Sequence, residues 1–469
     1  MARRRYRSSS IKPFLFKITL LFCVLAGGWL FYRNIFTFNP QRILDTSILK
    51  EKTFGAKPIE VISPRHKIKA YLIEDNTNPI ISFSLLFKNA GWASDDANKQ
   101  GLANITAAML TEGAGNLDSQ AFKETLENLA IGINFDASAD DFTASMITTS
   151  ENQQKAYKLF TDIITKPLFA SKDMQRIKDQ VQKSFIIQKE HPNSVLGLYF
   201  SEYLYKNHPY GRNPLGKWEN INKLTANDLR NFISTHFAKN NLIIGVAGDI
   251  SAEKLGTVLD YMFGSLPSNS SINFVRKTNI DFTHSPKNIT LPQASGQNIS
   301  AFASQGVARN HPDFYPLYIA NYILGGAGLN SRLSLAIREK EGLTYSIYSF
   351  LSLADKSSLI RGGFSCTKEN FNKVVSLLQK EWNNFGQNGV TKQEVEDAKK
   401  YLLSSYNLRF ASIKNLSEIL LYMQKDNLGL DFLQKRNENI KQVSIKDINR
   451  VAHKYFNTDK MLSVSVGQF

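Results

Sequence analysis

The sequence predicts an α+β protein of two homologous domains, each a mostly antiparallel sheet with helices packed on it, preceded by one N-terminal transmembrane helix. Two observations predict the domains: a segment near residue 225 recurs near residue 444, and each copy has the pattern of an amphipathic helix followed by a strand. A long apolar stretch close to the N-terminus predicts the membrane helix.

The internal repeat runs without a gap. Residues 224–237 and 243–248 match residues 443–456 and 462–467. Thr225 and Ser444 occupy equivalent positions, and their hydroxyls are suited to cap the helix that follows. Because the same order of helix, turn and strand occurs twice, we expect two domains built on one plan.

The similarity continues upstream of these helices. An amphipathic helix follows Ser150-Glu-Asn in the first copy and Lys368-Glu-Asn in the second, and a second helix is predicted over 170–188 and over 391–406. Thr391 and Glu394 have the spacing of a capping box, which supports the start of the latter helix. The alternating residues 81–87 and 464–466 predict half-buried strands.

These patterns divide the chain into segments. Residues 268–286 are rich in Ser and Asn without clear periodicity, which indicates a connection between the two copies. The predicted segments are a basic cytoplasmic tail (1–13), a signal anchor or transmembrane helix (14–33), a linker (34–50), an N-terminal domain (51–267), an inter-domain linker (268–290) and a C-terminal domain (291–469).

The N-terminal segment predicts the location. The formal net charge is +16, and basic residues are concentrated before residue 18; elsewhere the excess is diffuse and no basic stretch alternates with aromatic residues, so no nucleic-acid partner is expected. The apolar stretch is just long enough to span a bilayer, and its basic flank should stay cytoplasmic. We expect a single-pass protein of a bacterial inner membrane with its bulk facing the periplasm, or a periplasmic protein if residues 24–26 form a cleavage site.

Several motifs carry a resemblance to a known family. They are Gly101–Leu110 with Gly113, His208-Pro-Tyr-Gly211, Ile323-Leu-Gly-Gly326 and Ser331–Tyr345. In this order they resemble the pitrilysin/insulinase-type zinc metallopeptidases, also called inverzincins, over nearly everything from about residue 55 to the end. The resemblance implies a duplicated peptidase fold that acts on peptides or unfolded proteins.

The resemblance also shows what is missing. The family's H-x-x-E-H motif binds zinc through two histidines on one helix face, and its glutamate activates water. The four positions that correspond to these groups and to the third ligand hold Asn104, Ala107, Ala108 and Ser184. These side chains are poor zinc ligands or none, and no two of the seven histidines are three or four residues apart. We therefore expect a degenerate zinc site and no metal bound by this chain.

The second domain retains more of the family's chemistry. The resemblance implies that Arg338 and Tyr345 hold the substrate carbonyl and the developing oxyanion, a role suited to a guanidinium and a phenol. Arg338 could instead pair with Glu341, and Tyr345 could be a packing aromatic of a strand. Gly325, Gly326 and Gly328 either form a loop that contacts peptide substrate or serve as turn residues.

These expectations combine into one hypothesis. The chain is expected to be a non-catalytic, membrane-tethered subunit, inactive alone, that gives its Arg338 and Tyr345 donors to a homologous zinc-bearing partner. The zinc cofactor is expected in that partner. The alternatives are a catalytically silent scaffold, comparable to the core subunits of respiratory complexes that resemble this family, and a peptide-binding, chaperone-like chamber.

Overall fold

The computed structural model describes residues 57–272, 275, 280, 282 and 288–469. The chain divides into two units, residues 1–55 and residues 56–469, and every described residue belongs to the second unit. The predicted basic tail, signal anchor and first linker, residues 1–50, lie outside the described residues.

The predicted location needs a correction. Within the described part of the chain, no helix is both long enough and apolar enough to cross a bilayer. Helix α5 (Ser171–Glu190) has 20 residues, but Lys, Arg, Asp and Glu side chains are spread along it. The expectation of a single-pass membrane protein facing the periplasm, or of its cleaved periplasmic form, is therefore not supported.

The first half forms a six-stranded sheet, sheet 1, in the order β1-β2-β6-β3-β5-β4. All neighbouring strands are antiparallel except the parallel pair β2 and β6. Its strands are β1 (Ile59–Ile62), β2 (Lys69–Glu74), β3 (Ile80–Phe87), β4 (Gly132–Ala137), β5 (Phe142–Thr149) and β6 (Leu242–Gly248). Its α-helices are α2 (Leu102–Met109), α3 (Ser119–Asn128), α4 (Gln153–Thr165), α5, α6 (Pro192–Tyr205), α7 (Trp218–Ile221), α8 (Ala226–His236) and α9 (Ala252–Phe263).

The second half forms a five-stranded sheet, sheet 2, in the order β7-β11-β8-β10-β9. Its strands are β7 (Asn288–Pro292), β8 (Asn298–Gln305), β9 (Ser346–Leu353), β10 (Ser358–Cys366) and β11 (Met461–Gly467). Its helices are α10 (Phe314–Asn321), α11 (Phe371–Asn388), α12 (Lys392–Ser404), α13 (Ile413–Lys425), α14 (Phe432–Gln442) and α15 (Ile445–Tyr455), with the π-helical segments η5 (Tyr322–Gly326) and η7 (Ser334–Glu339) and the 3-10 segment η8 (Ser405–Ala411).

The two sheets confirm the predicted duplication. Strands β2, β6, β3, β5 and β4 have the same order and relative directions as β7, β11, β8, β10 and β9, and β1 is an addition to the first half. The helix caps predicted at Thr225 and Ser444 and the capping box predicted at Thr391 are all formed, and each of the three is a capping box. Strand β7 begins at Asn288, inside the segment predicted as the inter-domain linker.

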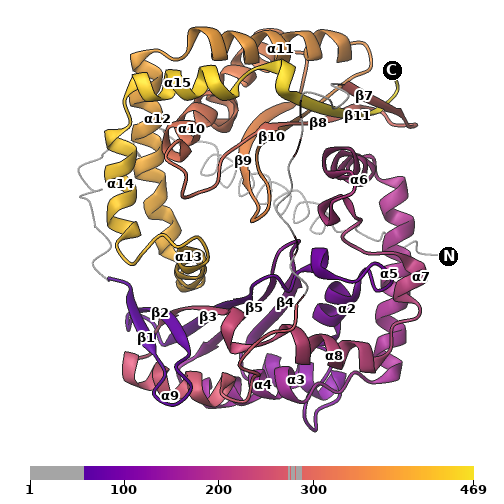
Figure 1. The fold of residues 1–469 in the computed structure, drawn as a ribbon, viewed down its shortest axis with the longest axis vertical. Coiled ribbons are helices and arrows are strands. Elements are labelled where there is room, and N and C mark those ends of the chain that lie inside the picture. Colours follow the sequence, from indigo (N-terminus) through magenta and orange to yellow (C-terminus); the bar gives the residue numbers. More distant parts are fainter. Residues whose placement is uncertain (1–56, 273–274, 276–279, 281, 283–287) are drawn as a thin grey trace, which may run out of the picture. The chain divides into compact units, whose positions relative to one another are not determined.

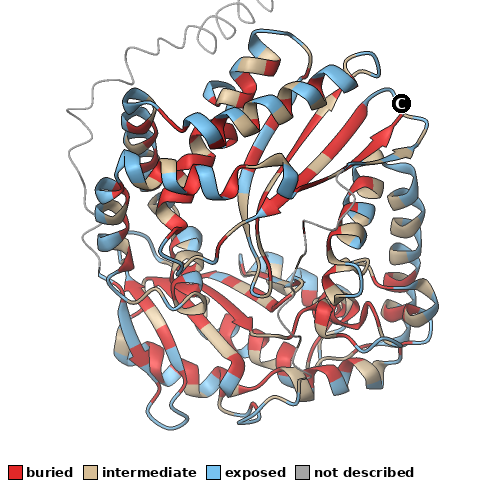
Figure 2. Cartoon of the chain, turned by 45° about the horizontal axis from the view of Figure 1, so that its top comes forward, coloured by how far each residue is buried: buried red, intermediate tan, exposed pale blue. Residues whose placement is uncertain are grey.

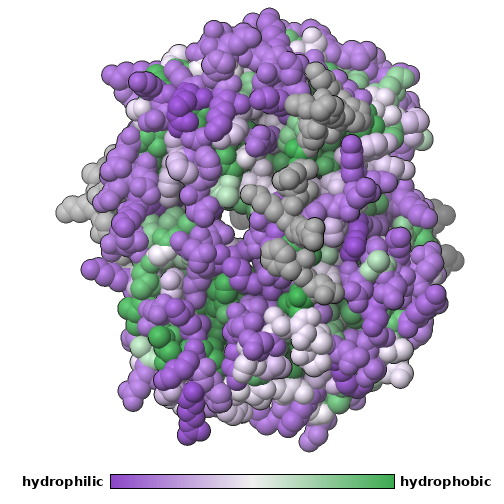
Figure 3. Space-filling view, viewed as in Figure 1, coloured by the Kyte–Doolittle hydropathy of each residue, from purple (hydrophilic) through white to green (hydrophobic). Residues whose placement is uncertain are grey.

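Each half has its own core on the outer face of its sheet, where helices cover the strands (Figures 1 and 2). In the first half, Phe87 stacks on Phe237 with ring centroids 4.1 Å apart. In the second, Trp382 is fully buried and contacts Phe302 and Phe456. Hydrophilic residues cover most of the surface in the view of Figure 3.

The inner face of each sheet is covered by a helix from the other half. Helix α13 of the second half packs on β2, β3 and β6 of sheet 1, as Figure 1 shows. The Ser417 hydroxyl lies 3.0 Å from that of Ser82 and 2.8 Å from that of Ser84. A Cβ atom at Gly245 would lie 2.2 Å from the Ser417 carbonyl oxygen, so this close approach requires glycine.

Helix α6 of the first half covers sheet 2 in the same way. Leu196, Phe200 and Leu204 are buried in one cluster with Val464 and Val466 of β11. Strands β3 and β11 were predicted to be half-buried; residues 81–87 and 464–466 are instead all buried. The reason is that helices of the same half cover one face of each strand, and a helix of the other half covers the opposite face. That helix is α13 for β3 and α6 for β11.

Candidate functional site

Helix α2 carries three of the four positions where the family has its zinc chemistry. It begins after Gly101, whose φ of 101° suits a residue without a side chain. The buried carboxylate of Asp95 accepts hydrogen bonds from the amides of Gly101, at 2.9 Å, and Ala103, at 3.2 Å, and so caps the helix. Burial raises the pKa of Asp95 to about 7, because the backbone donors only partly offset the loss of solvation.

The residues predicted as degenerate zinc positions lie on two helices that are in contact, and they offer no zinc ligand set. Asn104, Ala107 and Ala108 lie on α2, which packs against α5, where Ser184 is found. The Asn104 amide donates to the carbonyl of Pro214, and the Ser184 hydroxyl donates to the carbonyl of Gln180 at 3.0 Å. Zinc sites in proteins are built from Cys, His and carboxylates, and among the described residues no three such side chains form a group that could hold a metal. These residues do not fit zinc.

Side-chain amides cross-link the elements around these positions. The amides of Gln188, on α5, and Asn213 exchange two hydrogen bonds of 3.3 and 2.7 Å. The Asn213 side-chain oxygen also accepts the amide of Leu215 at 3.0 Å. Together with the bond from Asn104 to Pro214, they tie α2 and α5 to the loop of residues 212–216 without a metal.

Tyr345 is open to solvent, whereas Arg338 is partly buried. Arg338 lies on the π-helical segment η7, and its Nε is 3.6 Å from the Glu339 carboxylate, a weak pairing. Tyr345 precedes β9 and is 70% exposed, and its hydroxyl has no hydrogen bond among the described residues. Glu341 pairs with Lys373 at 2.8 Å and not with Arg338. Neither alternative role considered from the sequence, a helix ion pair with Glu341 or a packing aromatic, is formed.

The three glycines differ in their surroundings. Gly325 is buried at the end of η5, and a Cβ there would lie 2.2 Å from the Ser349 hydroxyl of β9, so packing alone requires glycine. Gly326 is exposed, and Gly328 is exposed with a φ of 60°. A substrate contact through Gly326 or Gly328 stays a prediction.

The structure shows the packing role of one motif that the sequence analysis used only for the family resemblance. In His208-Pro-Tyr-Gly211, the Tyr210 hydroxyl donates to the carboxylate of Asp140. The tip of the β9–β10 hairpin docks on this pair: the amide of Asp355 donates to Asp140 at 3.0 Å and that of Lys356 to the Tyr210 hydroxyl at 3.2 Å. The motif therefore joins the second half to the first.

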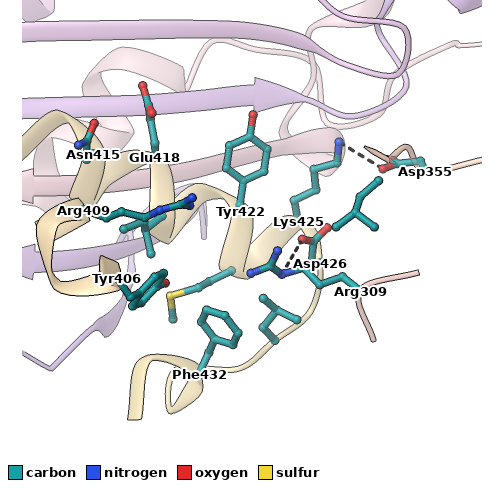
Figure 4. Close-up of a pocket in the computed structure, with 14 residues that line it drawn as sticks. Arg309, Asp355, Tyr406, Arg409, Asn415, Glu418, Tyr422, Lys425, Asp426 and Phe432 are labelled. Atoms are coloured by element: carbon teal, nitrogen blue, oxygen red, sulfur yellow. Dashed lines mark ion pairs between the residues drawn. The ribbon is translucent and has the colours of Figure 1, made fainter. Parts of the chain in front are cut away.

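Sequence reasoning missed a cavity of about 500 Å³ in the second half, which Figure 4 shows. It lies beside α13, between η8, the start of α14 and the end of β9. No motif points to it, because its lining is drawn from residues spread over positions 309–432 that only folding brings together. The lining is Arg309, Leu353, Asp355, Tyr406, Arg409, Asn415, Glu418, Ile419, Tyr422, Met423, Lys425, Asp426, Leu428 and Phe432.

The fold and the residues at these positions define a two-domain α+β protein of peptidase-like architecture whose described residues offer no zinc ligand set. Comparison with family models agrees: residues 70–217 match the insulinase family, M16, and residues 223–402 match the M16 peptidase inactive domain. The chain belongs to the M16 peptidase family. This confirms the resemblance to insulinase-type peptidases and the two-domain α+β fold.

Individual relatives resemble this chain over most of its length. The non-peptidase homolog YmxG of Helicobacter pylori is 27% identical over 385 residues, 82% of this chain and 88% of that protein. The mitochondrial-processing peptidase subunit beta of Saccharomyces cerevisiae is 25% identical over 334 residues, 68% of this chain and 71% of that protein. The crystal structure of a peptidase M16 inactive domain from Pseudomonas fluorescens has a TM-score of 0.81 and 27% identity, covering 88% of this chain and 98% of that one. These proteins share the fold and most of the length of this chain.

Proposed function

We propose that this chain is the non-catalytic subunit of a heteromeric zinc peptidase and that it supplies Arg338 and Tyr345 to the site of a zinc-bearing homologue. The observation that supports the proposal is the contrast between these two side chains and the residues at the zinc positions of α2. The α2 positions hold no zinc ligand and no catalytic base, whereas the Arg338 and Tyr345 side chains are present, at least partly accessible and without a strong partner among the described residues.

The exposure of Tyr345 supports this role. A phenol that is 70% exposed, with a hydroxyl that bonds to nothing in the described chain, contributes little packing to the fold. Placed beside a partner's reacting peptide bond, it would be a hydrogen-bond donor to the oxyanion that develops in the transition state. The yeast relative, named as a subunit of a processing peptidase, supports a multi-subunit setting.

The experiment mixes the purified chain with a zinc-bearing M16 homologue from the same organism and measures cleavage of an unfolded peptide. Neither the chain alone nor the chain with the homologue's zinc removed should cleave. Tyr345→Phe should leave assembly intact and lower turnover by about a hundred- to a thousandfold, the usual loss for one oxyanion donor.

Tyr261→Phe is the matched control, because Tyr261 is also an exposed tyrosine, 55% accessible, but lies on α9 in the first half. It should keep full activity. Full activity of the Tyr345→Phe complex would favour the scaffold function instead. Peptide binding without any partner-dependent cleavage would favour the chaperone-like chamber.

A further inference from the structure

The cavity beside α13 has an excess of positive charge at one end. The Tyr406 ring lies against two guanidinium groups, with the carbon of Arg436 at 3.7 Å and that of Arg409 at 5.8 Å from its centroid. Arg309 lines the same cavity. Burial raises the pKa of Tyr406, and the positive charges of the three arginines partly offset that rise. Two guanidinium groups thus flank this phenol, and a third lines the cavity beside it.

Few carboxylates lie close enough to neutralise these guanidinium charges. Arg436 is buried, and its hydrogen bonds within the described chain go to neutral oxygens, among them the Asn437 side chain at 2.9 Å and the Leu402 carbonyl at 3.2 Å. Arg409 is exposed and has no carboxylate within ion-pair distance in the described chain. Asp426 stands 3.6 Å from Arg309, whose buried Nε has no hydrogen bond.

The other acidic side chains that line the cavity are paired with lysines. Asp355 is paired with Lys425 at 3.2 Å, and Lys425 is also held by Asp141. Glu418 lies 4.0 Å from Lys414, one turn earlier on α13. Figure 4 shows Asp355 with Lys425 and Asp426 with Arg309 as separate pairs. The Tyr406 end therefore retains an excess of guanidinium charge, which attracts an anion.

The remaining walls indicate what the anion is attached to. Ile419, Met423, Leu428, Leu353 and Phe432 offer apolar surface, whereas Asn415 and Tyr422 offer hydrogen bonds. A purely hydrocarbon acid would leave these polar groups unmatched, but a peptide has amides to pair with them and an apolar side chain to bury. The volume of about 500 Å³ lies within the usual size of ligand pockets, about 300–1,000 Å³.

We propose that this cavity binds the terminal carboxylate of a peptide that ends in an apolar residue, with Arg409 and Arg309 as the carboxylate-binding groups. The inference deepens the proposed function, since it names a feature of the peptide, but it concerns the isolated chain. A failure of partner-dependent cleavage would therefore not count against this binding site. A failure of peptide binding in the cavity would likewise not count against partner-dependent cleavage.

The test is calorimetric titration of the full chain with N-acetyl-alanyl-alanyl-leucine, its C-terminal amide, and hexanoate. The free acid should bind at least tenfold more tightly than the amide and than hexanoate. Arg409→Gln should weaken binding of the free acid by about ten- to a hundredfold, which corresponds to one lost charge-assisted hydrogen bond. Arg65→Gln, an exposed arginine of the first half with no side-chain partner, is the control and should change nothing.

A variant with the opposite sign guards against effects of misfolding. Asp426→Asn removes the carboxylate that competes for Arg309 and should tighten binding of the free acid severalfold. Equal binding of acid and amide, or no effect of Arg409→Gln, would refute the site. Preference for hexanoate over the peptide would refute the peptide as its ligand, and the absence of any binding would refute both.

Discussion

The ammonium group of Lys425, at the end of α13, forms an ion pair with the buried carboxylate of Asp141, 284 residues earlier in the chain. The same ammonium is 3.2 Å from Asp355 at the tip of the β9–β10 hairpin. Burial lowers the pKa of Lys425, but the two carboxylates outweigh that effect and raise it overall. The Lys425 side chain thus joins α13, the β9–β10 hairpin and sheet 1.

Lys425→Met should lower the free energy of unfolding by about 3–5 kcal/mol, because it leaves the Asp141 carboxylate buried without its partner. Urea unfolding followed by circular dichroism measures this. Adding Asp141→Asn should recover much of the loss, since the unpaired charge is gone. Lys435→Met, in a solvent-exposed pair with Asp431, should change the free energy of unfolding far less than Lys425→Met does. Equal effects of the two lysine variants would contradict the role of Lys425.

Gly245→Ala should destabilise the protein by about 1–3 kcal/mol through overpacking, because the added methyl group would meet the carbonyl of Ser417 and push α13 off sheet 1. Gly197→Ala is the control with the opposite sign. Gly197 lies within α6, and a Cβ there meets nothing within 4 Å, so alanine should stabilise the helix by about 0.5–1 kcal/mol. Thermal unfolding of both variants checks the pair; stabilisation by both would mean that α13 adapts freely.

Asp95 should make stability depend on pH. Its pKa is about 7 in the folded chain, against 3.8 in an unfolded one. The folded state therefore holds this proton more tightly, and the free energy of unfolding should fall as pH rises from about 4 to 7, by at most about 1.4 kcal/mol per pH unit. Asp95→Asn removes this contribution. If the stability difference between wild type and Asp95→Asn were the same at pH 5 and pH 7, the carboxylate would already be ionised in the fold.

The purified chain should contain no stoichiometric zinc, because Asn104, Ala107, Ala108 and Ser184 provide no ligand set. Elemental analysis after mild chelation tests this. The combined variant Asn104→His, Ala107→Glu, Ala108→His and Ser184→Glu should gain zinc, approaching one ion per chain. Zinc retained tightly by the wild type would show that the metal site had been misplaced.

Much of the local structure could be predicted from the sequence because its causes are local. The capping residues Thr225 and Ser444 start their helices through bonds to backbone amides three residues away, so the repeat is visible without a structure. The loss of ligands at Asn104 and Ala108 is likewise a matter of residue type. Helices α2 and α5 are in contact in the structure, whereas the roles of Arg338 and Tyr345 stay a prediction.

The burial of β3 and the cavity around Tyr406 were decided by the tertiary structure alone. Alternation along β3 indicates one polar face, yet Ser82 and Ser84 are buried because Ser417, more than 300 residues later, bonds to their hydroxyls. The cavity arises because α13 turns its other face toward η8 and α14. Such contacts depend on which surfaces meet when α13 and α6 pack on the sheet of the other half. The periodicity within one segment does not show which distant segment will cover it. The sequence by itself determined the elements and the missing chemistry, whereas long-range packing decided which faces became interior and where a ligand could fit.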